Sequence, residues 1–248
     1  MTQRIVSLEP SITATLAALG QRHRLVGVTR YCHRLAEVTG LPQLDTTWTV
    51  KADEVAALQP DLVIAATPYQ AGKIDTLLQA KLDVLCLYPQ SVADVYRHIR
   101  WLGRLCDAAD QADTLVAQMQ TGLADLIRRA KDKPRQRVYV EEWPKPLMTA
   151  GLWIAELVEL LGGDCVPQPT GRQVTDQEVI EADPEVIILC WAGIEQMDPE
   201  RVLARAGWSN VSAVRSGRVV AVNEILLNAP GPNLVEGAQQ LWQALYPA

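Results

Sequence analysis

The chain has 248 residues, of which 48% are apolar and 21% are charged, and its formal net charge is −6. This length and composition suit a globular protein with one large core or two smaller ones. The acidic balance argues against nucleic acid as a partner, because nucleic acid attracts basic surfaces. The longest uncharged stretches are shorter than the about 20 residues that a membrane-spanning helix needs, so we expect no membrane insertion.

Residues 1–11 (MTQRIVSLEPS) lead directly into a predicted strand and lack the successive regions of an export signal. The five cysteines are an odd number without a C-x-x-C pair, which favours free, mostly buried thiols in a reducing compartment. We therefore expect a cytoplasmic protein from the sequence as it stands, and a periplasmic one if an export signal has been removed. We also expect a monomer.

In chain order, the first half begins with a strand at residues 4–8 and a helix that ends at Leu19 and Gly20. Glycine suits the position after a helix because it tolerates a positive φ. Further strands are predicted at residues 26–28, 62–66 and 84–88. Strands that alternate with helical patterns indicate a parallel sheet covered by helices.

The second half repeats the first. Residues 54–65 read EVAALQPDLVIA and residues 178–189 read EVIEADPEVIIL, so the Glu-Val pair and the proline fall at the same offsets. Both segments predict a short amphipathic helix, a proline that ends it, and a buried strand. Arg4 and Arg137 each open a strand in the corresponding place. We therefore predict two copies of one α/β unit.

A long helix separates the two copies. Between residues 108 and 133 the apolar side chains recur every four residues, which predicts a helix of roughly 37 Å that holds the lobes apart. The predicted organisation is an N-terminal α/β lobe at 1–106, a bridging helix at 107–134 and a C-terminal α/β lobe at 135–248, with a ligand cleft between the lobes. The alternative is a single doubly wound domain with one long peripheral helix.

Ligands of open parallel sheets bind beyond the carboxyl ends of the strands. The loops predicted there are rich in aromatic and neutral polar side chains, although only 5% of the chain is aromatic. Such side chains suit a large, flat, partly apolar ligand. The candidate ligand-binding residues are Pro10, Ser11, Tyr31, Trp48, Thr67, Tyr69, Glu142, Trp143, Trp191, Asn223 and Asn228, and Ser11 is also a candidate N-cap of the first helix.

Enzyme motifs find little support. Cys32 and His33 resemble a nucleophile beside a base, but neighbouring side chains in a strand or loop point apart, so a packed thiol is the simpler interpretation. Of Glu141 and Glu142, one is expected to face the ligand and the other to face away. The three histidines are far apart in the sequence, so no resident metal site is expected, although His33 is a candidate axial ligand to a metal that arrives within the ligand.

Across nearly its whole length the chain resembles the cobalamin-binding branch of the substrate-binding proteins that serve iron-siderophore, haem and corrinoid transporters. The resemblance rests on six segments in order, which are residues 5–11, 25–32, 58–65, 146–151, 160–163 and 230–237. It implies two lobes joined by one long helix, no enzyme activity, no intrinsic cofactor, and cobalamin or another corrinoid as the ligand.

Carried over by position, the resemblance places Tyr31 and Trp48 against a corrin ring. Ala229 and Asn233 stand where family members often carry arginine, and arginine would suit the carboxylates of haem or of a siderophore. Ala66 stands where corrin binders can carry tryptophan, which would leave a wider pocket.

Members that serve transporters dock through an exposed glutamate on each lobe. Lys73 stands near the first of these positions, which argues against docking on a permease. Asp198 and Glu200 are candidates for the second position. An ABC permease is therefore a candidate partner, although the positive charge of Lys73 argues against docking. The alternative functions are a haem or siderophore binder and a tetrapyrrole-processing, chelatase-like enzyme.

Overall fold

The structure is a computed structural model that describes residues 3–46, 48–66 and 71–247. It contains two compact units. Unit 1 comprises the residues up to Met119 together with Ala229–Asn233, and unit 2 comprises Gln120–Asn228 and Leu234–Ala248. Each unit has its own five-stranded sheet and its own covering helices, so the predicted α/β class with two similar units is confirmed.

The boundaries between the units differ from the predicted ones in two ways. Helix α5 (Ala109–Ala130) has 22 residues, or roughly 33 Å, and it is divided between the units rather than forming a separate part. The short segment Ala229–Asn233 belongs to unit 1 although it lies inside the second half of the sequence. The sequence pattern could not indicate that Ala229–Asn233 joins unit 1, because this assignment depends on contacts between residues far apart in the chain.

Unit 1 contains a wholly parallel sheet in the order β3-β2-β1-β4-β5. Its strands are β1 (Ile5–Ser7), β2 (Leu25–Thr29), β3 (Gln43–Leu44), β4 (Leu62–Ala66) and β5 (Val84–Leu87). Its helices are α1 (Pro10–Ala18), α2 (Ala52–Ala57), α3 (Ala71–Gln79) and α4 (Val92–Leu105), with short 3-10 turns at Arg22–Arg24 and Cys32–Arg34. The strand order reverses between β1 and β4, which is where ligands of such sheets bind.

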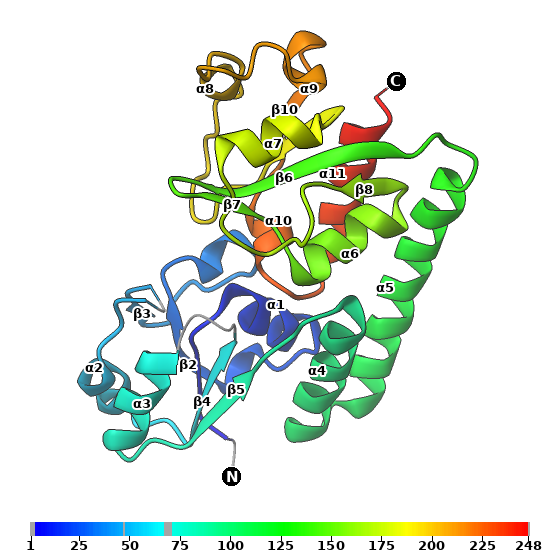
Figure 1. Ribbon diagram of the computed structural model, residues 1–248. Coiled ribbons are helices and arrows are strands. Elements are labelled where there is room, and N and C mark those ends of the chain that lie inside the picture. The colour runs from blue at the N-terminus through cyan, green and yellow to red at the C-terminus, as the bar shows by residue number, and fades with distance from the viewer. Residues whose placement is uncertain (1–2, 47, 67–70, 248) are drawn as a thin grey trace. The chain divides into compact units, whose positions relative to one another are not determined.

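The sheet of unit 1 is covered on both faces (Figure 1). Val6, Leu8 and Val63 pack against α2 and α3 in one apolar cluster. Helices α1 and α4 pack against each other, and α1 also contacts β1, β2 and β4. Because both faces are buried, the strands are continuous apolar runs, as expected for a parallel sheet.

Unit 2 repeats the arrangement with one change. Its strands are β6 (Gln136–Pro144), β7 (Leu147–Thr149), β8 (Gly163–Cys165), β9 (Val186–Leu189) and β10 (Val219–Ala221). The pairs β6–β8, β6–β9 and β9–β10 are parallel, and they correspond to β1–β2, β1–β4 and β4–β5 of unit 1. Strand β7 is antiparallel to the end of β6, so the sheet of unit 2 is mixed rather than purely parallel as predicted.

The helices of unit 2 are α6 (Leu152–Leu160), α7 (Asp176–Ala182), α8 (Glu200–Leu203), α9 (Ser212–Arg215), α10 (Ile225–Asn228) and α11 (Leu234–Leu245). Gly162 follows α6 with a φ of +87°, and Gly20 follows α1 with a φ of +73°. This confirms the predicted role of Gly20, and Gly162 has the same role, because a side chain at either position would strain the backbone.

The two central strands begin in the same way. The guanidinium of Arg4 donates to the carbonyl oxygens of Leu58 and Gln59 at 2.7 and 2.9 Å, and its backbone N–H donates to Asp61 at 2.7 Å. The guanidinium of Arg137 donates to the carbonyl oxygen of Asp183 at 2.8 Å, and its backbone N–H donates to Glu185 at 2.9 Å. The repeat predicted from the sequence is thus present down to individual hydrogen bonds.

None of the helices in the described part of the chain is both long and apolar enough to cross a membrane.

Candidate functional site

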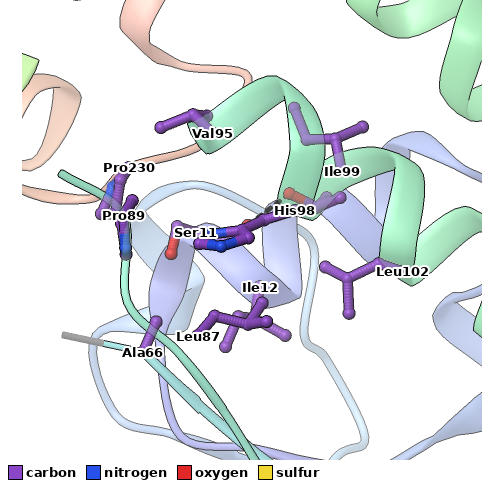
Figure 2. A pocket seen from close by; sticks show the side chains of 11 residues that line it. Ser11, Ile12, Ala66, Leu87, Pro89, Val95, His98, Ile99, Leu102 and Pro230 are labelled. Atoms are coloured by element: carbon purple, nitrogen blue, oxygen red, sulfur yellow. Dashed lines mark hydrogen bonds between the residues drawn. The ribbon is translucent and has the colours of Figure 1, made fainter. Parts of the chain in front are cut away.

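A small hollow lies at the carboxyl edge of the sheet of unit 1 (Figure 2). It is located where β4 and β5 end and where α1 and α4 lie side by side, and Pro230 of the returning segment forms part of its wall. About 10 Å³ is enclosed, which is room for about one water-sized group. The lining residues are Ser11, Ile12, Thr15, Ala66, Leu87, Pro89, Val95, His98, Ile99, Leu102 and Pro230.

Two polar side chains face this hollow without a hydrogen bond among the described residues, and these are Ser11 and His98. Ser11 is 2% exposed and His98 is 7% exposed. Burial, with a further contribution from the positive charge of Arg97, lowers the pKa of His98, so its imidazole is neutral near pH 7. The neutral ring and the hydroxyl can each donate or accept one hydrogen bond.

The start of α1 explains why Ser11 faces the hollow. Pro10 is the first residue of the helix and is buried there, and Glu9 is the N-cap without a side-chain hydrogen bond. The proline ring fixes a φ that suits this first position, so the helix begins two residues earlier than an N-cap at Ser11 would place it. Ser11 is therefore not the N-cap, and its hydroxyl is not used to hold the end of the helix.

Tyr31 is half-buried after β2. The guanidinium of Arg30 lies 5.0 Å from the centre of its ring and donates to its hydroxyl at 3.2 Å. The same guanidinium pairs with Asp45 at 3.5 Å. His33 is exposed, and its Nδ1 lies 2.5 Å from the carbonyl oxygen of Arg30. Among the described residues, no group of three or more His, Cys, Asp or Glu side chains that could hold a metal ion is found.

Trp48 is 56% exposed in the turn after β3, which is a large apolar surface to leave in water. Two further candidates of unit 1, Thr67 and Tyr69, lie outside the described residues.

Cys32 is a packed thiol. It is fully buried, its sulfur lies 3.1 Å from the hydroxyl of Thr13 and 3.3 Å from that of Thr29, and burial raises its pKa. The adjacent His33 is exposed, so the two side chains point apart as predicted. All five cysteines are free, and four of them are buried.

Unit 2 gathers carboxylates and an amide at the carboxyl edge of its sheet. Glu142 on β6 is half-buried, and this burial raises its pKa to about 7. Glu224 follows β10 and is buried. The Nδ2 of Asn228 donates to the carbonyl oxygen of Cys190 at 2.8 Å and to Glu224 at 3.3 Å, while its buried Oδ1 has no partner among the described residues. This edge therefore offers hydrogen-bond acceptors.

Two other candidates of unit 2 lie at its surface. Trp143 is 40% exposed and donates from its indole nitrogen to the carbonyl oxygen of Lys145 at 2.9 Å. Asn223 is exposed, and its backbone N–H donates to the side chain of Gln240 at 2.8 Å. Both remain accessible to a ligand.

Trp191 requires a correction. We predicted that it faces the ligand, but it is only 1% exposed and lies in the apolar core of unit 2. Its indole nitrogen donates to Glu141 at 2.9 Å, and Arg205 donates to both oxygens of the same carboxylate at 2.8 and 3.0 Å. Trp191 and Glu141 therefore serve the core, and of the two neighbouring glutamates only Glu142 is available at the edge.

Lys73 is the residue whose positive charge argued against docking on a permease. It is half-buried on α3, and its ammonium donates to the carbonyl oxygen of Val50 at 3.4 Å. Asp75 on the same helix is exposed, and so are Asp198 and Glu200 in unit 2. The ammonium of Lys73 is therefore partly occupied by a hydrogen bond within unit 1, so it opposes docking less than a fully exposed cation would.

Sequence reasoning missed His98 and Glu224. The signal for His98 is its position on α4, where it shares one face with Val95, Ile99 and Leu102 at helical spacing. A histidine among buried apolar residues needs a partner or a function. No comparable signal marks Glu224, because its burial depends on neighbours that are distant in the sequence.

Two α/β units of one design carry polar and aromatic candidate residues at the carboxyl edges of their sheets, where ligands of such sheets bind. The comparison with known families identifies the class of protein. The chain belongs to the family described as periplasmic binding protein, whose model matches residues 5–226.

Three similar proteins illustrate the range of the family. An uncharacterized ABC transporter substrate-binding lipoprotein of Bacillus subtilis, YvrC, is 31% identical over 99% of this chain and 80% of its own length. The vitamin B12-binding protein of Vibrio parahaemolyticus is 25% identical over 93% of this chain and 84% of its own length. A possible iron-binding periplasmic protein of Staphylococcus epidermidis has a solved structure with 28% identity, a TM-score of 0.83 and 98% coverage of both chains.

Proposed function

We propose that this chain is a binding protein for a corrinoid, such as cobalamin, and that it leaves the ligand chemically unchanged. The observation that carries the proposal is the character of the carboxyl edge of unit 1. Trp48 presents an exposed indole, and the described residues that line the hollow beside Ser11 have neutral side chains. A corrin ring is a large flat surface whose rim carries neutral amides, and such a ligand matches both features.

The acceptors of unit 2 support the same ligand class. The Oδ1 of Asn228 lacks a donor among the described residues, and the carboxyl of Glu142 has none either. Amide N–H groups would supply donors to both. Haem and carboxylate siderophores would instead place anions near these oxygens, and like charges repel.

The cations of unit 1 do not favour an anionic ligand. Ala229 and Asn233 carry no charge, and the guanidinium of Arg30 is already paired with Asp45. The groups that bind carboxylates most tightly are arginine guanidinium groups that donate two parallel hydrogen bonds. The name of the Vibrio parahaemolyticus relative also supports a corrinoid.

The test is a calorimetric titration of the purified protein with cyanocobalamin, dicyanocobinamide and haemin. We expect saturable binding of the two corrinoids and recovery of each with an unchanged absorption spectrum and mass. Saturable binding of haemin alone, with a shifted Soret band, would establish the haem-binding alternative. Conversion of a tetrapyrrole and a metal ion into product would establish the enzyme alternative.

Trp48→Ala tests the placement of the ring. We expect the variant to bind cyanocobalamin more weakly by about 1–3 kcal/mol, the value of a buried aromatic contact. Leu160→Ala at the end of α6 is the matched control, because Leu160 is a similarly exposed apolar residue outside the candidate site. Equal affinities for the wild type and Trp48→Ala would show that the ring lies elsewhere.

We further propose that the partner is an ABC permease and that the protein acts outside the cytoplasmic membrane. The support is the name of the Bacillus subtilis relative and the inward hydrogen bond of Lys73, which removes part of the opposing charge. Cell fractionation with an antibody against the chain tests this directly. Recovery with the cytosolic marker proteins would contradict it and would restore the cytoplasmic expectation.

A further inference from the structure

The hollow of unit 1 contains two buried polar side chains whose hydrogen-bonding capacity is unused. His98 is 7% exposed and makes a ring contact with Trp101 at 5.1 Å, but its nitrogens have no hydrogen bond in the described chain. Ser11 is 2% exposed, and its hydroxyl also has no hydrogen bond in the described chain. Their polar atoms are not among the fully buried atoms without a partner, so they remain accessible from the hollow, and a group that enters it can complete their hydrogen bonds.

The two side chains converge. Figure 2 shows the imidazole of His98 extending from α4 toward Ser11 on α1, with Pro89 and Pro230 beside them. The returning segment fits closely over the start of α1, since a Cβ at Gly231 would lie 3.1 Å from the Cβ of Ser11. The position of both groups is therefore fixed by three separate parts of unit 1.

The remaining wall decides the charge of the occupant. Ile12, Leu87, Val95, Ile99 and Leu102 are apolar, and among the described lining residues none carries a formal charge while His98 is neutral. The start of α1 would favour an anion, but the field of one helix end is weak. A carboxylate buried here without a cation would lose more in solvation than that field returns.

The size of the hollow decides how much of the ligand enters. The space of about 10 Å³ has room for about one water-sized atom, so only the terminal atom of a side arm can enter and a ring cannot. A primary carboxamide matches this size and polarity, because the atom that enters is either its oxygen, which accepts a hydrogen bond, or its nitrogen, which donates one.

We propose that this hollow receives the end of one primary carboxamide arm of the ligand, with Ser11 and His98 as its hydrogen-bond partners, and that it rejects the corresponding carboxylate. This inference rests on the proposed corrinoid binding. It goes beyond that function because it assigns a selective role to His98, which no pattern of aromatic residues indicates.

The experiment compares cyanocobalamin with the derivatives in which one peripheral amide at a time is hydrolysed to a carboxylate. For the wild type we expect one derivative to bind at least tenfold more weakly than cyanocobalamin, with smaller effects for the others. His98→Phe and Ser11→Ala should each weaken binding of cyanocobalamin by about threefold to tenfold, as expected for one lost hydrogen bond. His98→Gln should recover part of the loss because its amide can still hydrogen-bond.

The selectivity distinguishes a binding role from a structural one. For His98→Phe, the difference in affinity between cyanocobalamin and the weakest-binding carboxylate derivative should be smaller than for the wild type. The reason is that the imidazole that hydrogen-bonds to the amide is absent. The melting temperature should not fall, since a buried polar group without a partner is replaced by an apolar one. His23→Phe is the matched control, because His23 is exposed on the turn before β2.

Two results would overturn the inference. Binding of cyanocobalamin with equal affinity by the wild type, His98→Phe and Ser11→Ala would show that no arm of the ligand bonds to these side chains in the hollow. Equal affinity of the wild type for all the carboxylate derivatives would show that no amide is read there. In both cases corrinoid binding itself stands, whereas the absence of any corrinoid binding by the wild type would refute the proposed function first.

Discussion

The two units share a frame and differ in what fills it. Arg4 and Arg137 anchor the two central strands with the same hydrogen bonds, and the strands beside them pair in the same register. Four residues later the units differ, because Leu8 of unit 1 corresponds to Glu141 of unit 2 and both side chains are fully buried. The amino ends of the strands have kept the architecture, while the carboxyl ends, where ligands bind, have diverged.

The largest expected effect on stability comes from removing Arg205, the partner of the buried carboxylate that distinguishes unit 2 from unit 1. Arg205→Ala leaves the carboxylate of Glu141 buried at 0% exposure without its cation. We expect a loss of about 3–5 kcal/mol in the free energy of unfolding, measured by urea denaturation. The double variant Glu141→Leu with Arg205→Met copies the apolar choice of unit 1, and it should be more stable than Arg205→Ala. A double variant as unstable as the single one would show that the pair is not the cause.

The next effect is a pH dependence at Glu142. Burial raises the pKa of its carboxyl to about 7 in the folded protein, above the value of about 4.3 for an unfolded chain. Between these values the folded state binds more protons than the unfolded state, so Glu142 makes stability fall as the pH rises from about 4 to 7.

Glu142→Gln should remove this fall, so that the variant gains about 3–4 kcal/mol relative to the wild type between pH 4 and pH 8. Urea denaturation at several pH values measures it. Glu236→Gln on α11 is the control, because Glu236 is exposed. Parallel pH profiles for the wild type and Glu142→Gln would contradict the assignment.

The smallest effect tests the shared frame. Arg4→Ala and Arg137→Ala should each cost about 1 kcal/mol, the value of an exposed hydrogen-bonded contact. The hydrogen bonds of the Arg4 guanidinium go to carbonyl oxygens, whereas Arg137 also pairs with Asp183 at 3.2 Å and Glu185 at 3.7 Å. Salt screens ion pairs, so only the cost of Arg137→Ala should shrink in 1 M sodium chloride. Equal salt responses would mean that the charges contribute nothing.

The frame was predictable because its signals are local. The Glu-Val pair, the proline and the β-branched run occur within 12 residues in each unit, and they predicted β4 and β9 at their observed places. Periodicity also predicted the long helix, although not where it passes from one unit to the other. The antiparallel strand β7 was not foreseen, because a hairpin of this kind leaves only a short apolar pattern.

The candidate site was predictable only in part, because side-chain direction depends on distant partners. The position of Ser11 after β1 was enough to place it at the edge of the sheet. Trp191 also follows a strand, but it turns inward because Glu141, 50 residues away, needs a buried donor. His98 was overlooked since it lies on a helix rather than in a loop, and only the packing of α4 against α1 brings it to the hollow.

The segment Ala229–Asn233 has a consequence for how the protein can be made. Pro230 completes the wall of a hollow whose other described residues all precede Gly103, so this pocket stays open until Pro230 has left the ribosome. A fragment that stops at Met119 carries every strand of the first sheet and still lacks that wall. Biosynthesis thus delays a finished binding pocket until the second sheet has also been translated.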